Sequence, residues 1–324
     1  MTNLQILDII FQMNRSKTDS YGTYDISVLY TFYKAFTVSS LRAVTIPCIK
    51  SILYNFFFRQ YRANLLPGRV PVSLVDDPLD KKIPFIPLWV NIYIDFTFLW
   101  IRMLGFLLRK YRFRSYTAVR EFIVSIGKLY AFAAESYKKN FSTTKRPFYI
   151  ARPRFFVIHL VDPHLMCIPS LHVMLAIITY TRFALMLRSL NEEKNNKAQI
   201  EELKQGALAI SKAVLYVKQH SINCISAALY AMTCFDEKLF PPHEAEAFAS
   251  ILLKPSASGK RKKKQKNQKV RPEAAPHTNL PEAEVKELTA HIINLYRRFL
   301  NEKNSCQNWE EPLLNFMRRM PPAL

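Results

Sequence analysis

Residues 84–108 read PFIPLWVNIYIDFTFLWIRMLGFLL and contain only two charged side chains, Asp95 and Arg102. This stretch is long enough to cross the hydrocarbon core of a bilayer as a single helix. Four basic residues follow it directly: Arg109, Lys110, Arg112 and Arg114. Because basic clusters favour the cytoplasmic side of a membrane, we predict a membrane-spanning helix here, with a buried helix of a soluble core as the alternative.

Other apolar segments flank this stretch. One precedes it and four follow it: Val28–Phe58, Phe122–Ala134, Leu171–Leu187, Ala207–Val217 and Ile222–Phe235. Ala207–Val217 is too short to span a bilayer unless Glu201–Gly206 extends it. Val28–Phe58, interrupted at Pro47, is either a further span or an interfacial helix. The sequence therefore predicts an all-α fold, a multi-span membrane bundle of about five or six helices.

Antiparallel spans place successive connectors on alternating sides of a membrane. In this arrangement the basic and aromatic connector 135–168 lies on the same side as His220. Basic residues after the first, third and fifth segments, counted from residue 84, lie on the other side. We therefore predict a multi-pass membrane protein whose basic C-terminal tail is cytoplasmic.

The composition changes abruptly after residue 254. Residues 254–281 read KPSASGKRKKKQKNQKVRPEAAPHTNLP, with nine basic side chains up to Arg271 and one acid, Glu273. Such a segment cannot bury a core, so we predict a disordered tail. It is either a solvated linker or, through 254–271, an attachment to anionic lipid headgroups. A basic RNA-binding or membrane-surface protein is a further alternative, but we do not expect nucleic acid as a partner because the chain has no RNA-binding fold motif.

An amphipathic helix is predicted at Pro281–Lys303. Its apolar residues fall on one stripe: Val285, Leu288, Ile292, Leu295, Tyr296 and Phe299. We expect this helix to pack on the body of the protein or on another chain. The predicted regions are thus 1–80, an apolar and basic N-terminal region; 81–250, the helical domain; 251–281, the basic linker; and 282–324, the C-terminal helix and tail.

The overall charge and the scarcity of glycine limit the classes of function. Lys and Arg number 46 against 25 Asp and Glu, a net charge of +21 that predicts an anionic partner. Only six residues are Gly, and none has the spacing of a Gly-rich phosphate loop or dinucleotide fingerprint. The five cysteines are scattered and form neither a disulfide framework nor a zinc site.

Three short motifs lie at the ends of apolar segments. They are Lys-x6-Arg-Pro, which occurs at both 139–147 and 145–153, Pro-Ser-Leu-His at 169–172, and Lys-Gln-His at 218–220. Lys and Arg donate to phosphate oxygens, and histidines act as nucleophiles and acids. Pro169 and Ser170 before an apolar run predict a helix start, whose backbone N–H groups favour an anion. These residue types are therefore compatible with an anionic partner such as a phosphate group.

In order and spacing these motifs resemble the type 2 phosphatidic acid phosphatase superfamily, the integral-membrane lipid phosphatases and phosphotransferases. They look closest to its inositol phosphorylceramide synthase-like branch. KIPFIP at 82–87 and Asp162, seven residues before Pro169, are also similar to that branch. The resemblance covers residues 80–236 and leaves the first 80 residues and the region after 250 outside it.

The resemblance implies a role for each motif residue. His220 would attack phosphorus and form a phosphohistidine, and His172 would protonate the leaving alkoxide. The residues expected to hold the phosphate are Lys139, Arg146, Ser170 and Lys218, with Lys145 and Arg152 as the other register of the first motif. The scheme needs no metal or cofactor, and the spacing of His159, His164 and His172 gives no preformed set of metal ligands.

The third motif is degenerate. Cys224 stands where the family has an Asp that orients the nucleophilic histidine, and Ala213-Val214 stand where it has a Ser-Arg pair. A thiol is a poor acceptor from an imidazole N–H, although Lys218 would compensate for the lost cation. The motifs therefore leave two functions: a membrane lipid phosphatase or phosphotransferase, and a catalytically degenerate relative that binds lipid or acts as a scaffold. The basic RNA-binding or membrane-surface protein stays as the third, less favoured alternative.

Overall fold

The structure is a computed structural model that describes residues 22–66, 68–149, 151–255 and 280–323. This part of the chain is predominantly helical, which confirms the predicted all-α class. Its strands are the short parallel pair β1 (Val72–Leu74) and β2 (Phe141–Thr143). The helices are α2 (Val28–Thr37), α3 (Ser39–Ile52), α4 (Arg59–Leu65), α5 (Val90–Lys110), α6 (Tyr116–Lys139), α7 (Pro153–Val161), α8 (Leu171–Ser189), α9 (Lys197–Tyr216), α10 (Ile222–Phe235), α11 (Pro242–Leu252), α12 (Glu282–Lys303) and α13 (Glu311–Arg318).

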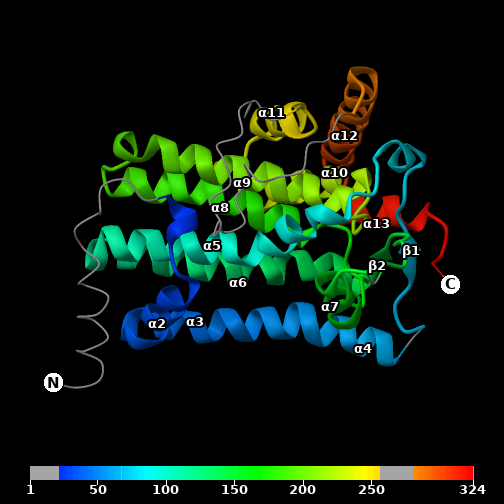
Figure 1. Cartoon of the computed structure of the whole chain (residues 1–324). Coiled ribbons are helices and arrows are strands. Elements are labelled where there is room, and N and C mark those ends of the chain that lie inside the picture. The colour runs from blue at the N-terminus through cyan, green and yellow to red at the C-terminus, as the bar shows by residue number, and fades with distance from the viewer. Residues whose placement is uncertain (1–21, 67, 150, 256–279, 324) are drawn as a thin grey trace.

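The long helices run alongside one another as an up-and-down bundle (Figure 1). The π-helical turns of Leu53–Phe58 join α3 and α4 into one continuous helix. Because short connections reverse the chain between α5 and α6 and between α8 and α9, the connectors 66–89, 140–170 and 217–221 all return to one end of the bundle. This is the right-hand end in Figure 1. The predicted meeting of the 135–168 connector with His220 is therefore confirmed.

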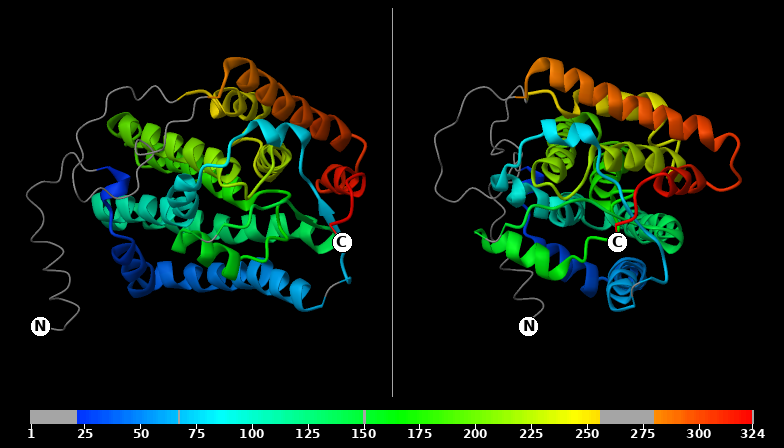
Figure 2. Two further views of the ribbon diagram at one scale, coloured as in Figure 1. Left: turned by 45° about the vertical axis from the view of Figure 1, so that its right-hand side comes forward. Right: turned by 90° about the vertical axis from the view of Figure 1, so that its right-hand side faces the viewer.

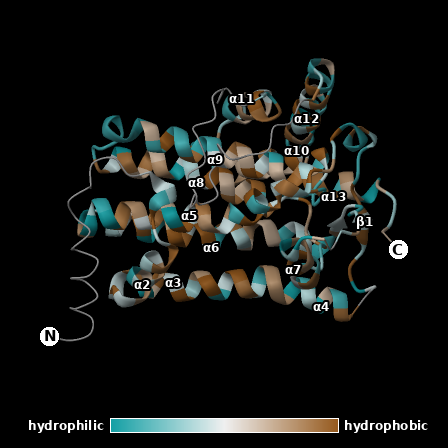
Figure 3. Cartoon of the chain, viewed as in Figure 1, coloured by the Kyte–Doolittle hydropathy of each residue, from teal (hydrophilic) through white to brown (hydrophobic). Residues whose placement is uncertain are grey.

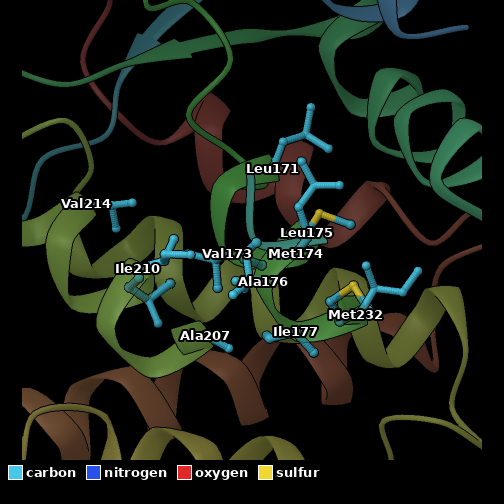
Figure 4. Close-up of a cluster of buried hydrophobic side chains, with 14 of the residues drawn as sticks. Leu171, Val173, Met174, Leu175, Ala176, Ile177, Ala207, Ile210, Val214 and Met232 are labelled. Carbon is cyan, nitrogen blue, oxygen red and sulfur yellow. The ribbon is translucent and has the colours of Figure 1, made fainter. Parts of the chain in front are cut away.

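The core centres on α8, which contacts α5, α6, α9 and α10. Every residue from Leu171 to Tyr180 is buried. Its side chains interleave with Ile210 and Val214 of α9 and with Met232 of α10 (Figure 4). Close packing on all sides holds the first turn of α8 rigidly, and this turn carries Ser170 and His172.

The predicted C-terminal helix is confirmed as α12. It lies with α11 on one side of the bundle and covers α10 (Figure 2). Five of the six predicted stripe residues are buried, and Val285 is half-buried. The apolar stripe of α12 packs on α10 and shields it from the surroundings, while the charged residues of α12 lie on its outer face. The predicted basic tail lies largely outside the described residues, as do residues 1–21.

Three helices in the described residues are long and apolar enough to cross a membrane: Ser39–Leu65, Pro87–Lys110 and Leu171–Ser189. The sequence predicted five or six. Glu201–Gly206 does extend Ala207–Val217, since α9 begins at Lys197, but the added turns contain Glu201, Glu202 and Lys204. Helix α10 has 14 residues and is therefore about 21 Å long, short of a bilayer core of about 30 Å.

The three apolar helices differ in how much the protein covers them. The apolar windows of Pro87–Lys110 and Leu171–Ser189 are 67% and 72% buried, whereas that of Ser39–Leu65 is 17% buried. Leu53, Tyr54 and Phe58 are each more than half exposed on this helix. Figure 3 shows the brown apolar colour running along α3 and α4 at the edge of the bundle.

The end opposite the connectors brings the ends of α5 and α8 together. A guanidinium nitrogen of Arg114 donates to the carbonyl of Leu190 at 3.3 Å, so the basic residues that follow the first and third segments are neighbours, as predicted. The fifth segment does not reach that end. Asp236, directly after α10, pairs with Arg182 at 2.8 Å, about two helical turns before the end of α8.

Candidate functional site

Two histidines and a serine meet where the connectors converge. Nε2 of His220 lies 3.3 Å from Nδ1 of His172 and 3.4 Å from Oγ of Ser170. All three residues are buried, with exposed fractions of 6%, 8% and 0%. Because 48 and 50 residues separate these pairs along the chain, their contact is a product of the tertiary fold. The structure therefore brings together the second and third predicted motifs.

Ser170 occupies the N-cap position of α8, as the Pro-Ser signal predicted. An N-cap serine usually accepts a hydrogen bond from the backbone of its own helix. The Ser170 side chain makes no such bond, and its hydroxyl faces the His220 ring instead. The hydroxyl and the positive end of the helix dipole are thus both directed at the histidines, an arrangement that suits an anion.

His220 is held by the turn between α9 and α10. Lys218 adopts a left-handed conformation with φ of 54°, which lets its N–H and that of Gln219 bond back to the last turn of α9. This is the Schellman arrangement, in which glycine usually occupies the left-handed position. Ser221 then caps α10 by accepting from the N–H of Asn223 at 3.2 Å. His220 therefore sits between two helix ends that restrict its backbone.

Aromatic rings from α5 surround His172. Its ring stacks on Tyr93 with a centroid distance of 4.7 Å and an interplanar angle of 27°. Phe96 approaches from one turn further, with its centroid at 4.2 Å. These contacts fix the plane of the imidazole and direct its Nδ1 to His220. The composition of the apolar stretch gave no signal for this role, since aromatic residues in a helix are usually core.

Arg146 brings a cation to the site. One of its guanidinium nitrogens donates to the side-chain oxygen of Gln219 at 3.3 Å and to the carbonyl of Asp162 at 3.4 Å. Both acceptors are neutral, and Arg146 makes no ion pair with any residue that the structure describes. Gln219 directly precedes His220, so the guanidinium is fixed to the same turn. The Arg146 guanidinium has no anionic partner among the described residues, so it can bind an anionic ligand.

A second polar group lies behind His220. Thr144 Oγ1 is 2.8 Å from Nε2 of His164, and Asp162 accepts from the His164 backbone N–H at 2.9 Å. The His164 and His220 rings are 6.0 Å apart. Burial disfavours the charged carboxylate of Asp162, but its contacts with His164 outweigh this and lower its pKa. Asp162 therefore stays ionised and places a negative charge near the histidines.

In the described residues, no hydrogen bond or ion pair joins the other predicted cations of the first motif to the histidines. Nζ of Lys139 pairs with Glu310 at 2.7 Å, in the turn before α13. Lys145 is exposed, and its backbone N–H donates to Asp76. Arg152 is the N-cap residue of α7. Of the two registers considered for the motif, the structure thus brings the arginine of the first, Arg146, to the site without its lysine.

Lys218 also faces another part of the chain. Its ammonium donates to the backbone carbonyl of Asp80 at 2.5 Å. The Asp80 carboxylate in turn accepts from the N–H of Ile222 at 3.0 Å, at the start of α10. Lys218 therefore fastens the turn that holds His220 to the segment before α5. No sequence signal indicated Asp80, because its partners come from more than 130 residues away.

Cys224 lies one helical turn after His220 and interacts with the thiol of Cys167. No carboxylate occupies this position. Nδ1 of His220 is buried and has no hydrogen bond of normal geometry, while the backbone carbonyl of Cys167 lies near the ring and favours its protonated form. The imidazole is consequently positioned by Nε2 and by its backbone, and its Nδ1 lacks the acceptor that would define the tautomer.

Among the described residues, no group of three or more His, Cys, Asp or Glu side chains has an arrangement that holds a metal ion. The site consists of neutral donors, imidazoles, one guanidinium and the nearby Asp162 carboxylate. Comparison with known protein families, curated proteins and solved structures finds no match for this chain.

The buried histidines predict that the fold loses stability in acid. Burial lowers the pKa of His220 well below its usual value, with His172 and His164 adding to the effect, and burial also lowers the pKa of His164. The unfolded chain, with a histidine pKa of about 6.5, then binds more protons than the folded chain below that pH. Stability is fully present above pH 6.5 and falls below it by at most about 1.4 kcal/mol per pH unit for each such group.

We therefore expect the unfolding free energy in detergent to drop between pH 6.5 and pH 5, and His220→Gln to reduce the slope. His243→Gln is the matched control, because the structure places His243 on α11 away from the site. An unchanged slope in His220→Gln would mean that His220 titrates equally in the folded and unfolded chains.

Proposed function

We propose that this protein is a membrane enzyme that cleaves a phosphate ester of a lipid, with His220 as the nucleophile and His172 as the proton donor. One observation carries this function: His220, His172, Ser170 and Arg146, which come from three separate motifs, meet in one buried site. Two imidazoles, a hydroxyl at a helix start and an unpaired guanidinium together supply a nucleophile, an acid and anion donors.

In the first step Nε2 of His220 attacks phosphorus, and the bond from phosphorus to the lipid oxygen breaks. A proton from His172 passes to that oxygen, so the lipid leaves as an alcohol and a phosphohistidine remains. In the second step water attacks phosphorus, the phosphorus–nitrogen bond breaks, and His172 takes up the proton of the water. If a lipid hydroxyl replaces water, the same steps transfer the phosphoryl group.

Electrostatics support the role of His220 as the nucleophile. A nucleophilic imidazole must be neutral, and burial keeps the pKa of His220 low, so its lone pair is free at neutral pH. The Arg146 guanidinium, the Ser170 hydroxyl and the first N–H groups of α8 are donors to the phosphate oxygens. A phosphate that binds at Nε2 takes the place of the direct contact between His220 and His172.

A second function has an observation in its favour. The unpartnered Nδ1 of His220 and the thiol at Cys224 leave the nucleophile without an orienting carboxylate. A catalytically degenerate membrane protein that binds a lipid phosphate, as a lipid carrier or scaffold, keeps every other feature of the site. The two functions share phosphate binding and differ in whether a phosphorus–nitrogen bond forms.

The three apolar helices support a membrane location, and the exposed apolar face of α3–α4 supports contact with lipid. We expect the full chain to stay in the membrane pellet after alkaline carbonate extraction. In vesicles that contain brominated lipid, Leu53→Trp adds fluorescence that the lipid quenches, because Leu53 is exposed on that face. Ala290→Trp, exposed on the polar side of α12, is the control and is not quenched. A chain released into the carbonate supernatant excludes the membrane location.

The assignment of the two histidines is tested with phosphatidic acid in detergent micelles. His220→Ala and His172→Ala are each expected to lower phosphate release by at least about 1000-fold, because each removes a group that takes part in bond making or proton transfer. Labelled substrate should leave acid-labile phosphate on the wild-type chain and on none of the His220→Ala chain. The control His243→Ala keeps full activity. Undiminished release in His220→Ala would exclude it as the nucleophile.

Cys224→Asp separates the enzyme from its degenerate alternative. A carboxylate one turn after His220 gives Nδ1 an acceptor, and we expect phosphate release to rise about tenfold or more. Cys234→Asp, on the same helix but at its far end, is the matched control. Activity in Cys224→Asp alone, with an inactive wild type, identifies the wild type as degenerate. A folded Cys224→Asp chain without activity contradicts both the enzyme and the restored site.

A further inference from the structure

A cavity of about 550 Å³ lies beside α4, separate from the histidine site. Its outer wall is α4 with the turn that follows, and its inner wall is the end of α6, the start of β2 and Leu165. The outer wall is formed by residues of 59–66 and 68–70, which lie outside the region that resembles the phosphatase superfamily. None of the catalytic or phosphate-binding candidates discussed above lines this cavity, so it is a distinct feature of the fold.

The cavity is strongly cationic. Arg59, Arg62, Arg69 and Lys138 line it, and none of its lining residues is acidic. Lys138 pairs with Glu135, but the three arginines make no ion pair with any residue that the structure describes. Nε of Arg59 is buried without a hydrogen-bond partner. A buried donor left without an acceptor is costly, so an anionic oxygen in the cavity would satisfy it.

Apolar side chains continue from the cavity along α3–α4. Tyr54 and Phe58 line it, stack on each other at 5.7 Å, and are 57% and 53% exposed. Leu53 and Leu65 extend the same exposed apolar surface, at 53% and 78%. The site thus combines a cationic cavity with an apolar track that leads away from it, which matches a ligand with an anionic head and an apolar tail.

The position of the cavity along the helix fits a membrane boundary. Ser39–Leu65 has the length and composition of a span, and the arginines lie in its last two turns and just after it. Arginine side chains at the end of a span reach the depth of the lipid headgroups. The cations are therefore at the depth of phosphate groups, while the apolar track lies at the depth of the acyl chains.

We propose that this cavity binds the headgroup of an anionic phospholipid, with the acyl chains lying along the exposed face of α3–α4. A phospholipid is favoured over a free phosphate ion because only the lipid uses the apolar track. The site does not depend on turnover by His220. It is coupled to the catalytic end through Gln60 on α4, which accepts from the N–H of Leu165 at 3.1 Å, one residue after His164.

The experiment uses the full chain with His220→Ala, so that no lipid is consumed, in detergent micelles. Native mass spectrometry measures the binding of dioctanoyl phosphatidylglycerol, a phosphodiester with one negative charge, and of zwitterionic dioctanoyl phosphatidylcholine. The anionic lipid is expected to bind at least about tenfold more tightly, since several cations attract its anionic headgroup and not the zwitterionic one. The triple variant Arg59→Gln, Arg62→Gln, Arg69→Gln should abolish this preference.

Two further variants isolate the cavity. Ala63→Trp fills it without changing the charge and should weaken binding of the anionic lipid by a similar factor. A control triple variant removes three positive charges from exposed positions elsewhere and should leave binding of the anionic lipid unchanged. It carries Arg112→Gln, Arg120→Gln and Lys128→Gln. Thermal unfolding in the same detergent verifies that each variant is folded.

Three outcomes would overturn the proposal. Equal binding of the two lipids would exclude a headgroup site, and equal loss in the control triple variant would mean that only total charge matters. Displacement of the lipid by millimolar inorganic phosphate would identify a site for a small anion instead. Because the readout is binding by a His220→Ala chain, failure here leaves the test of catalysis by His220 and His172 unaffected.

Discussion

The burial of α8 at the centre of the bundle is the constraint on which the rest of the site depends. Its first ten residues are buried against α5, α6, α9 and α10, and a helix packed on all sides cannot slide or rotate without opening cavities. Ser170 and His172 are therefore fixed in direction by packing that is mostly aliphatic. Polar residues of the connectors, His220 and Arg146 among them, reach the start of α8 because α8 begins at the end of the bundle where the connectors converge.

Tethers from distant segments hold the facing side of the site. The turn with His220 is fastened to Asp80 through Lys218 and through the first N–H of α10. Directly behind it, His291 of α12 lies 2.9 Å from Asn223 Oδ1 and 3.3 Å from Asp77. The C-terminal helix thus does more than cover α10, because it joins the 76–80 segment to the start of the helix that follows His220.

Much of the site was predictable because its residues occur in short motifs at the ends of apolar segments. The helix start at Ser170 followed from such a local signal, whereas the joint role of His172 and His220 was expected from the resemblance of the motifs to the phosphatase superfamily. The partners of Lys139, Lys145 and Lys218 were not predictable, because a lysine in a basic connector is compatible with many partners. Glu310 and Asp80 become partners of Lys139 and Lys218 through contacts between segments distant in sequence. In the described residues three helices have the length and composition of a span, against the five or six that were predicted, because charged turns extend α9 and α10 is short.

The sequence by itself determined the all-α class, the apolar segments, the amphipathic C-terminal helix and the histidine and arginine candidates. Each of these depends on patterns within a few turns of chain, where periodicity and capping act. Only the tertiary structure decided that Arg146 lies at the histidine site while Lys139 pairs elsewhere. It also decided that the rings of Tyr93 and Phe96 pack on His172, and that three arginines line one cavity beside α4. Those relations arise from the packing of helices far apart in sequence, which local patterns do not encode.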